Sequence, residues 1–102
     1  MPVSFKVPTY NLDSIKTALS SVEKLTMTNI ARGCASAMGM DDQDVVDVIQ
    51  RLKPENFYKT MPSDKCPHLQ QFDVYHGDWK GTDIYLKFQF FNGFLVVSFK
   101  EK

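Results

Sequence analysis

The sequence predicts an α+β fold in which N-terminal helices pack on one face of a C-terminal antiparallel β-sheet. Two observations lead to this prediction. Apolar residues recur at helical spacing as far as Leu52, and from Phe72 onward they alternate with polar residues, as in strands with one exposed face. The chain has 102 residues, of which 43% are apolar, and this size and composition suit a single domain over residues 1–102.

The first helix is expected directly after Asn11, because asparagine caps helix N-termini well. Residues 24–27, which follow this helix, are long enough only for an edge strand or an extended link. The apolar positions of the helix share one face, and they are Leu12, Ile15, Leu19 and Val22.

Two further helices are expected before residue 54. Thr28 or Asn29 can cap the second, and Gly39 is expected to end it. The third begins at Asp41 or Asp42, where acidic residues suit the positive end of the helix dipole.

Pro54 limits the third helix, since the residue before a proline avoids helical geometry. We expect residues 55–61 to form a turn of helix or an irregular segment, and residues 62–67 to form a loop. The first long strand then contains Phe72 and Val74 on its buried side, and residues 76–81 form a long connection to the next strand.

The last two strands form a hairpin around Asn92-Gly93, the pair that favours a two-residue type I′ turn. Phe91 then faces Phe94, which fixes every later pair. The buried face is predicted to hold the pairs Phe90 with Leu95, Phe88 with Val97, and Leu86 with Phe99. The exposed face is predicted to hold Gln89 with Val96, Lys87 with Ser98, and Tyr85 with Lys100.

This register makes Tyr85 and Lys100 direct cross-strand neighbours, with Lys87 one step along the same face. Nearby ammonium groups favour a phenolate, so they would lower the pKa of Tyr85, and they would also bind a phosphate. Tyrosine and lysine are equally ordinary occupants of a solvated sheet face, and that interpretation stays open.

Charge and composition exclude several classes of protein. Twelve basic side chains balance twelve acidic ones, with four against six in residues 1–50 and eight against six in residues 51–102. A nucleic-acid binder is usually more basic, so RNA binding would need a local cationic face. No apolar run is long enough for a membrane span and the N-terminus lacks a signal-peptide layout, so we expect a cytoplasmic protein without a membrane partner.

The two cysteines are too few for a disulfide framework. Cys66 and His68 have a spacing found in metal sites, but the chain has just one other cysteine, Cys34, and one other histidine, His76. Four ligands at structural zinc spacing are therefore not provided, and we expect no metal.

Four segments resemble the motility quorum-sensing regulator (MqsR) toxins, which are small endoribonucleases of type II toxin–antitoxin systems. The similarity runs from about Val7 to the last residue. The segments are Asn56–Met61 (NFYKTM), Asp73–Tyr75 (DVY), Tyr85–Lys87 (YLK) and Leu95–Lys102 (LVVSFKEK).

The resemblance implies a RelE-like fold and cleavage of single-stranded mRNA without metal or cofactor, at GCN-type sites and independently of the ribosome. It also implies a cognate antitoxin bound through the sheet or its edge. The functional lysine of the Phe-Tyr-Lys segment corresponds to Lys59, the sheet tyrosine to Tyr85 and the terminal-strand lysine to Lys100.

One position departs from the family pattern. The family shows Trp-Gln before Asp-Val-Tyr, with the glutamine contributing to the site, whereas this chain reads Gln70-Gln71-Phe72. Successive strand residues point to opposite faces, so Gln71 can replace that glutamine as a catalytic residue only if the strand shifts or bulges.

The expected mechanism is attack of the RNA 2′-hydroxyl on the adjacent phosphate, which requires a base, an acid and positive charge. We assign charge stabilisation to Lys59 and Lys100, proton transfer to Tyr85, and substrate positioning to Lys87. His76 is a further candidate acid, because histidine titrates near neutral pH.

Two aromatic residues, Tyr75 and Trp79, are candidates for stacking on unpaired bases of the RNA. Trp79 is equally well explained as a loop aromatic folded onto the edge of the core. The competing function is a non-catalytic interaction module, or a weakened homologue, whose residues 24–27 pair with a strand of a partner protein.

Overall fold

In the part of the chain that the structure describes, three helices precede four strands. The structure, a computed structural model, describes residues 8–61, 71–90 and 93–101. The elements are α1 (Leu12–Ala18), α2 (Asn29–Ala37), α3 (Asp42–Gln50), the 3₁₀ turn η1 (Pro54–Asn56), β1 (Phe57–Met61), β2 (Phe72–Trp79), β3 (Thr82–Phe90) and β4 (Phe94–Glu101).

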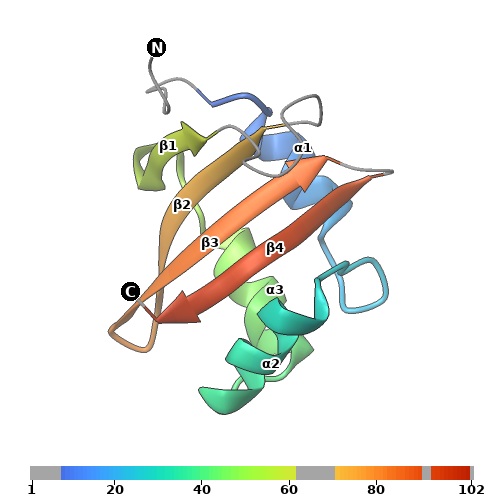
Figure 1. Ribbon diagram of the computed structural model, residues 1–102, viewed down its shortest axis with the longest axis vertical. Helices are drawn as coiled ribbons and strands as arrows, with labels where there is room; N and C mark the ends of the chain where they lie inside the picture. Colours follow the sequence, from blue (N-terminus) through green and yellow to red (C-terminus); the bar gives the residue numbers. More distant parts are fainter. Residues whose placement is uncertain (1–7, 62–70, 91–92, 102) are drawn as a thin grey trace.

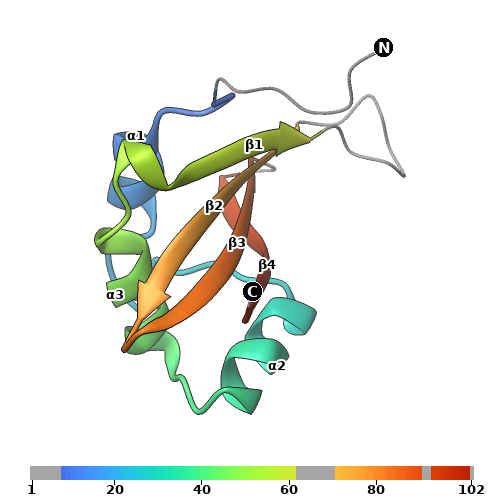
Figure 2. The same cartoon turned by 90° about the vertical axis from the view of Figure 1, so that its left-hand side faces the viewer.

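The strands form one sheet in the order β1-β2-β3-β4, and every neighbouring pair is antiparallel. Figure 1 looks onto these four strands. In the turned view, α1 and α3 lie on one side of the sheet, whereas α2 lies beside β4 (Figure 2). The arrangement confirms the predicted α+β class, with the helices N-terminal to the sheet.

The helix starts follow from capping chemistry. Asn11, Thr28 and Asp41 are the N-caps, and each side chain accepts a hydrogen bond from the backbone N–H three residues later. The Asp41 backbone N–H in turn donates to the Asp44 carboxylate, which completes a capping box. Gly39 follows the end of α2 with a φ of 80°, as predicted. None of the helices in the described part of the chain is long and apolar enough to cross a membrane.

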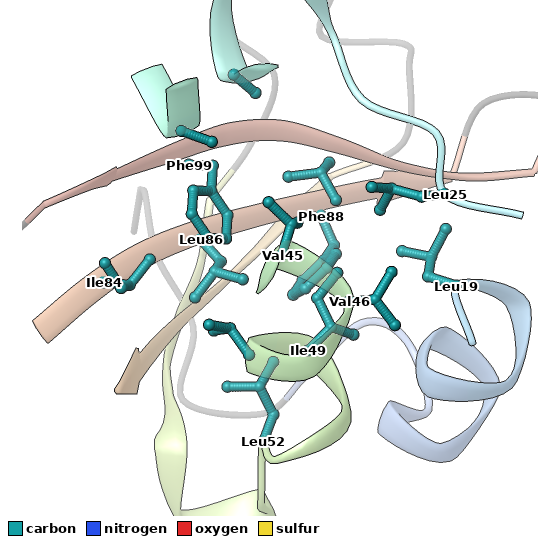
Figure 3. Close-up of a cluster of buried hydrophobic side chains, with 14 of the residues drawn as sticks. Leu19, Leu25, Val45, Val46, Ile49, Leu52, Ile84, Leu86, Phe88 and Phe99 are labelled. Carbon is teal, nitrogen blue, oxygen red and sulfur yellow. The ribbon is translucent and has the colours of Figure 1, made fainter. Parts of the chain in front are cut away.

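The core lies between the helices and one face of the sheet. Phe88, Leu86 and Phe99 of the sheet are no more than 1% exposed. They meet side chains from all three helices and from the loop after α1 (Figure 3). The helical and loop contributors include Ile15, Leu19, Leu25, Ala31, Ala35, Val45, Val46, Val48, Ile49 and Leu52.

Residues 24–27 pair with β4 of the same chain. Met27 forms a single parallel bridge to Val96 of β4. The Val96 N–H donates to the Thr26 carbonyl at 2.9 Å, and the Thr28 N–H donates to the Val96 carbonyl at 3.0 Å. One edge of this segment is therefore already used for pairing with β4.

Residues 57–61 differ from the sequence prediction. They form the edge strand β1, whereas we expected a turn of helix or an irregular segment through this region, and only η1 fits that expectation. Phe57 pairs with Tyr75, and Lys59 pairs with Val74, so Tyr58 is an extra residue in β1. Such a bulge re-aims side chains, and it places both Tyr58 and Lys59 away from the core.

Strand β2 is longer than predicted, and the side chains that it turns toward the helices differ from the predicted ones. It runs to Trp79, and the expected long connection is reduced to Lys80 and Gly81, with φ values of 51° and 84°. Two consecutive positive φ angles are the requirement of a type I′ turn. Tyr75 belongs to the core cluster and Gly77 lies against α3, so the core-facing side of β2 carries Tyr75 rather than Phe72. Val74 is fully buried, as predicted, but on the opposite side of the strand.

Gly77 explains how closely α3 approaches the sheet. A Cβ atom at this position would lie 2.9 Å from a methyl carbon of Val48 and 3.3 Å from methyl carbons of Leu52 and Leu86. A side chain there would force α3 away from β2, so the glycine is required by packing.

The register of β3 and β4 is partly as predicted. The pairs Tyr85–Lys100, Leu86–Phe99 and Lys87–Ser98 are confirmed.

A bulge beyond Lys87 shifts the rest of this hairpin by one residue, so Val96 enters the core in place of Val97, and Phe94 pairs with Phe90 instead of Phe91. Phe91 and Asn92 themselves lie outside the described residues. The predicted pairs Phe90–Leu95, Phe88–Val97 and Gln89–Val96 are therefore wrong, and the observed ones are Phe90–Phe94, Phe88–Val96 and Gln89–Leu95.

A buried carboxylate joins the N-terminal segment to the sheet. Asp73 is fully buried and accepts hydrogen bonds from the backbone N–H groups of Thr9 at 3.0 Å and Tyr10 at 2.8 Å. The Thr60 hydroxyl donates to the same carboxylate at 2.7 Å. Three donors offset the cost of burying this polar group, so Asp73 has a structural role.

Candidate functional site

The face of the sheet opposite the core cluster, termed the open face, gathers most of the predicted site residues. Register places Lys59, Val74, Lys87 and Ser98 in line across the four strands on this face. His76, Tyr85 and Lys100 form the neighbouring line. Cross-strand partners project to the same side of a sheet, so these two lines share one face, on which Val74 is fully buried.

Three rings form a row across β1, β2 and β3. The Tyr58 ring stacks on His76, with centroids 4.6 Å apart and planes inclined by 27°. His76 in turn faces Tyr85, with centroids 5.8 Å apart and planes inclined by 39°. The imidazole is therefore held between two phenol rings.

Lysine ammonium groups surround this ring row, which comprises Tyr58, His76 and Tyr85. The Lys59 Nζ lies 5.1 Å from the centroid of Tyr58 at one end, and the Lys100 Nζ lies 5.4 Å from that of Tyr85 at the other. The Lys87 Nζ lies 6.0 Å from the Tyr85 centroid. The local cationic face that RNA binding requires is thus present despite the neutral net charge.

The pKa of Tyr85 moves in the opposite direction from the one expected. Burial of the phenol raises its pKa above the ordinary value of 10.0, and the nearby Tyr58 adds to the increase. The sequence predicts that the lysines lower this pKa, whereas the desolvation of a phenolate on this face raises it. Tyr85 is therefore a neutral hydroxyl at neutral pH, which can donate a proton but is a poor base.

Tyr75 and Trp79 do not lie on the open face, which corrects their assignment to RNA binding. Tyr75 is 1% exposed and packs edge-on against Phe57 and Phe88. Burial raises the pKa of Tyr75 to about 12, with the Asp73 carboxylate as a further cause. Trp79 also packs against the core cluster, and the Lys80 Nζ lies 4.9 Å from its ring centroid. Neither ring is placed to stack beside Tyr85.

Gln71 is likewise not brought to the ring row. Its side-chain oxygen accepts a hydrogen bond from the Thr9 hydroxyl at 3.3 Å, and its carbonyl accepts one from the Tyr10 hydroxyl at 2.6 Å. Thr9 also binds Asp73, so Gln71 lies on the side of the strand that Asp73 occupies. The strand shift that would carry Gln71 to the open face is not present, so it does not take the place of the family's catalytic glutamine.

Tyr58 is the site residue that the sequence analysis missed. Its side chain is 43% exposed, and it reaches the open face because of the bulge in β1. The Phe-Tyr-Lys segment that drew attention to Lys59 also contains Tyr58, so the signal was present but was attributed to the lysine alone.

The open face has an acidic end. Asp78 of β2 lies directly opposite Asp83 of β3 next to the turn, and both are exposed. This like-charged pair bounds the cationic surface on that side and disfavours phosphate there.

Within the described residues, no group of three or more histidine, cysteine, aspartate or glutamate side chains is close enough to hold a metal ion. Cys66 and His68, the pair with metal-like spacing, lie outside the described residues.

Comparison with known proteins identifies the family. The model of the family described as "Motility quorum-sensing regulator, toxin of MqsA" matches residues 7–101. The chain belongs to the MqsR toxin family. A relative in this family, the mRNA interferase toxin MqsR of Escherichia coli (strain K12), is 35% identical over 92 residues, which cover 84% of this chain and 93% of the relative. The match spans β1 to β4, so the MqsR family region contains the whole ring row.

Proposed function

We propose that this toxin is an endoribonuclease that cuts single-stranded mRNA on the open face of its sheet, without a metal. The observation that carries the proposal is the confirmed pairing of Tyr85 with Lys100, beside His76 and within a ring row flanked by lysines. The relative's name, mRNA interferase toxin, supports the same substrate class. The described side chains can supply an acid, a base and positive charge, which is the full requirement for cleavage by the RNA's own 2′-hydroxyl.

In the proposed step, the 2′-oxygen attacks the adjacent phosphorus and the bond from phosphorus to the 5′-oxygen breaks. The 2′-hydroxyl loses its proton to a base, and the departing 5′-oxygen gains a proton from an acid. The products are a 2′,3′-cyclic phosphate and a free 5′-hydroxyl, so atoms and charge balance without an added cofactor.

Tyr85 is assigned as the acid. Its raised pKa keeps the phenol protonated at neutral pH, so that a proton is available for the leaving oxygen. The Lys100 ammonium over its ring stabilises the phenolate that forms when the proton leaves.

His76, which the sequence offers as a candidate acid, is assigned as the base because Tyr85 takes the acid role. Among the side-chain types of the ring row, histidine has the ordinary pKa closest to neutral pH, and a neutral imidazole can accept a proton. Its ring is held between Tyr58 and Tyr85, which fixes its orientation next to the acid.

Lys59 and Lys100 are assigned to the phosphate. They belong to β1 and β4, the two outer strands, and they lie at opposite ends of the ring row. A phosphate placed over the row would meet positive charge from both sides as negative charge builds up on it. Lys87, between them on β3, is assigned to positioning the RNA.

The proposal includes a partner and a location. Unrestrained cleavage of mRNA would arrest the host, so we propose that a cognate antitoxin covers the site or binds the sheet edge. The name of the matching family, toxin of MqsA, supports such a partner. We further propose preference for GCN-type sites and action in the cytoplasm, where mRNA is found.

Cleavage is tested by incubating the purified toxin with a long unstructured RNA in EDTA and sequencing the fragment ends. The proposal predicts fragments that end in cyclic phosphate and a sharp loss of fragments with Lys59→Ala and Tyr85→Phe. Intact RNA after incubation with correctly folded toxin would contradict the proposed activity.

The acid and base assignments are tested with an RNA whose scissile 5′-oxygen is replaced by sulfur. A thiolate leaves without protonation, so Tyr85→Phe should cut this RNA at nearly the wild-type rate. His76→Asn should stay slow, because the attacking hydroxyl still needs a base. Equal defects of both variants on the sulfur-substituted RNA would refute the assignment of Tyr85 as the acid.

A further inference from the structure

Tyr58 offers an aromatic surface beside the proposed reaction centre. The side chain is 43% exposed, whereas Tyr75, Phe88 and Phe99 of the same sheet are at most 1% exposed. The β1 bulge brings it to the open face next to Lys59. Bulges next to active sites commonly re-aim a side chain in this way.

The Tyr58 ring is held in place from the sheet side. It stacks on His76 at 4.6 Å, and His76 itself faces Tyr85. A ring that is already oriented by a second ring loses little freedom when a ligand stacks on it, so the site is preorganised for a flat aromatic group.

The charges beside Tyr58 indicate which flat group fits. The Lys59 Nζ lies 5.1 Å from the ring centroid, and Lys87 and Lys100 extend the cationic surface along the same face. A nucleobase in RNA is always accompanied by a phosphate, so a ring next to ammonium groups matches an unpaired nucleotide better than an uncharged aromatic side chain of a protein.

Relative strengths show that a base can displace Lys59 from the ring. Stacking of a base on an aromatic side chain changes affinity by about 5- to 150-fold. A cation–π contact at an exposed site is worth about two- to fivefold. The base therefore displaces the Lys59 ammonium from the Tyr58 ring, and the ammonium is left next to the phosphate of that nucleotide.

We propose that Tyr58 stacks an unpaired base of the RNA next to the cleaved bond, and that this stacking moves Lys59 from the ring to the phosphate. The inference rests on the proposed function, since it assigns a base-binding subsite to the same face. It makes Tyr58 a substrate-positioning residue, distinct from the proton-transfer groups Tyr85 and His76.

The test uses short single-stranded RNAs with a 2′-methoxy group at every position, which removes the attacking hydroxyl. Each RNA has 2-aminopurine at one position, and the fluorescence of this base is quenched when it stacks. Titration of the RNAs with wild-type toxin should show strong quenching at one position of the bound RNA. Tyr58→Leu should abolish that quenching and weaken binding by about 5- to 150-fold.

Two variants serve as controls. Tyr58→Phe keeps the ring and should retain both quenching and affinity. Phe90→Leu removes a ring of matching exposure, 42%, that lies beside Phe94 at the hairpin end of β3, and it should leave both unchanged. Circular dichroism of Tyr58→Leu should match the wild type, because the side chain contributes little to the core.

Failure of this inference is distinguishable from failure of the proposed function. Wild-type binding and quenching without any cleavage of unmodified RNA would support the base subsite and contradict the nuclease. Normal cleavage together with unchanged binding and quenching in Tyr58→Leu would overturn the base subsite alone. Loss of quenching in Tyr58→Phe as well would also overturn it, because the ring without its hydroxyl should suffice.

Discussion

The two faces of the sheet use the same kinds of side chain for different purposes. On the core face, Tyr75 is 1% exposed and packs against other rings, and the Asp73 carboxylate is fully buried with three hydrogen-bond donors. On the open face, Tyr85 sits between a histidine and lysine ammonium groups, and the carboxylates of Asp78 and Asp83 face solvent.

Strand alternation produces this division. Tyr75 and His76 are neighbours in the chain, yet one is part of the core and the other is the centre of the ring row. A tyrosine therefore gains a chemical role from the charges and rings around it rather than from its identity. Paired substitutions on the two faces should separate activity from stability.

The largest effect is expected from Tyr85→Phe. Loss of a general acid lowers a rate by about 100- to 10,000-fold, whereas the free energy of unfolding should change by no more than about 0.5 kcal/mol. The matched control is Tyr75→Phe, which removes the same hydroxyl from the core face and should cut RNA at the wild-type rate. Single-turnover cleavage of a labelled RNA measures both, and equal rates in the two variants would contradict the division.

Phe88→Ala should have the reverse effect. Phe88 is fully buried against Tyr75, and removing a phenyl ring from such a site costs about 3–5 kcal/mol of unfolding free energy. Lys87→Ala, one residue earlier but on the open face, should cost about 1 kcal/mol or less. Urea denaturation of both variants checks this, and a Lys87 variant as unstable as the Phe88 variant would show that the open face also supports the core.

Alkaline pH should destabilise the protein through Tyr75. Its pKa is raised from 10.0 to about 12, so between these values the unfolded chain has released this proton while the folded chain retains it. The contribution of Tyr75 to stability is therefore complete below pH 10 and falls by about 1.4 kcal/mol for each pH unit above it.

Denaturation of the wild type and of Tyr75→Phe at pH 9 and pH 11 isolates this contribution. From pH 9 to pH 11, the unfolding free energy of the wild type should fall by more than that of Tyr75→Phe. A difference that is the same at both pH values would show that burial does not hold the proton on Tyr75.

The smallest effect is expected at the acidic end of the open face. Asp78→Asn removes one carboxylate of the Asp78–Asp83 pair, and RNA affinity should rise about two- to fivefold at low salt and less at high salt. Asp13→Asn on α1 is the control, because this exposed carboxylate lies on the helical side of the molecule. A salt-titrated binding assay should show no gain for the control, and an equal gain would point to net charge alone.

The parts of the fold that sequence predicted well depend on local chemistry. Asn11, Thr28 and Asp41 cap helices because their side chains reach nearby N–H groups, and this requires nothing from the rest of the chain. The pairing of Tyr85 with Lys100 follows from the expected turn at Asn92-Gly93 and from burial on one face of the hairpin, and that part of the register is as predicted.

The parts that sequence did not predict are irregularities of the sheet. No residue type in the sequence marks the bulges near Tyr58 and Lys87, because their positions depend on how the strands pack on the helices. Lys80 adopts a positive φ that favours glycine or asparagine, so the tight turn after Trp79 lacked its usual sequence signal. Together these features decided which aromatic residues reach the site, and they explain why Tyr75 and Trp79 were assigned in place of Tyr58.

The most direct test of the open-face site is an NMR titration of the toxin with non-cleavable single-stranded RNA. His76 and Trp79 are three residues apart in β2 on opposite faces, and Trp79 is the single tryptophan of the chain, so their ring signals are readily compared. RNA binding is predicted to shift the imidazole signals of His76 and the ring signals of Tyr58 and Tyr85, while the Trp79 indole signal stays in place. A moving indole signal with unchanged His76, Tyr58 and Tyr85 would place the RNA on the other face and contradict the account.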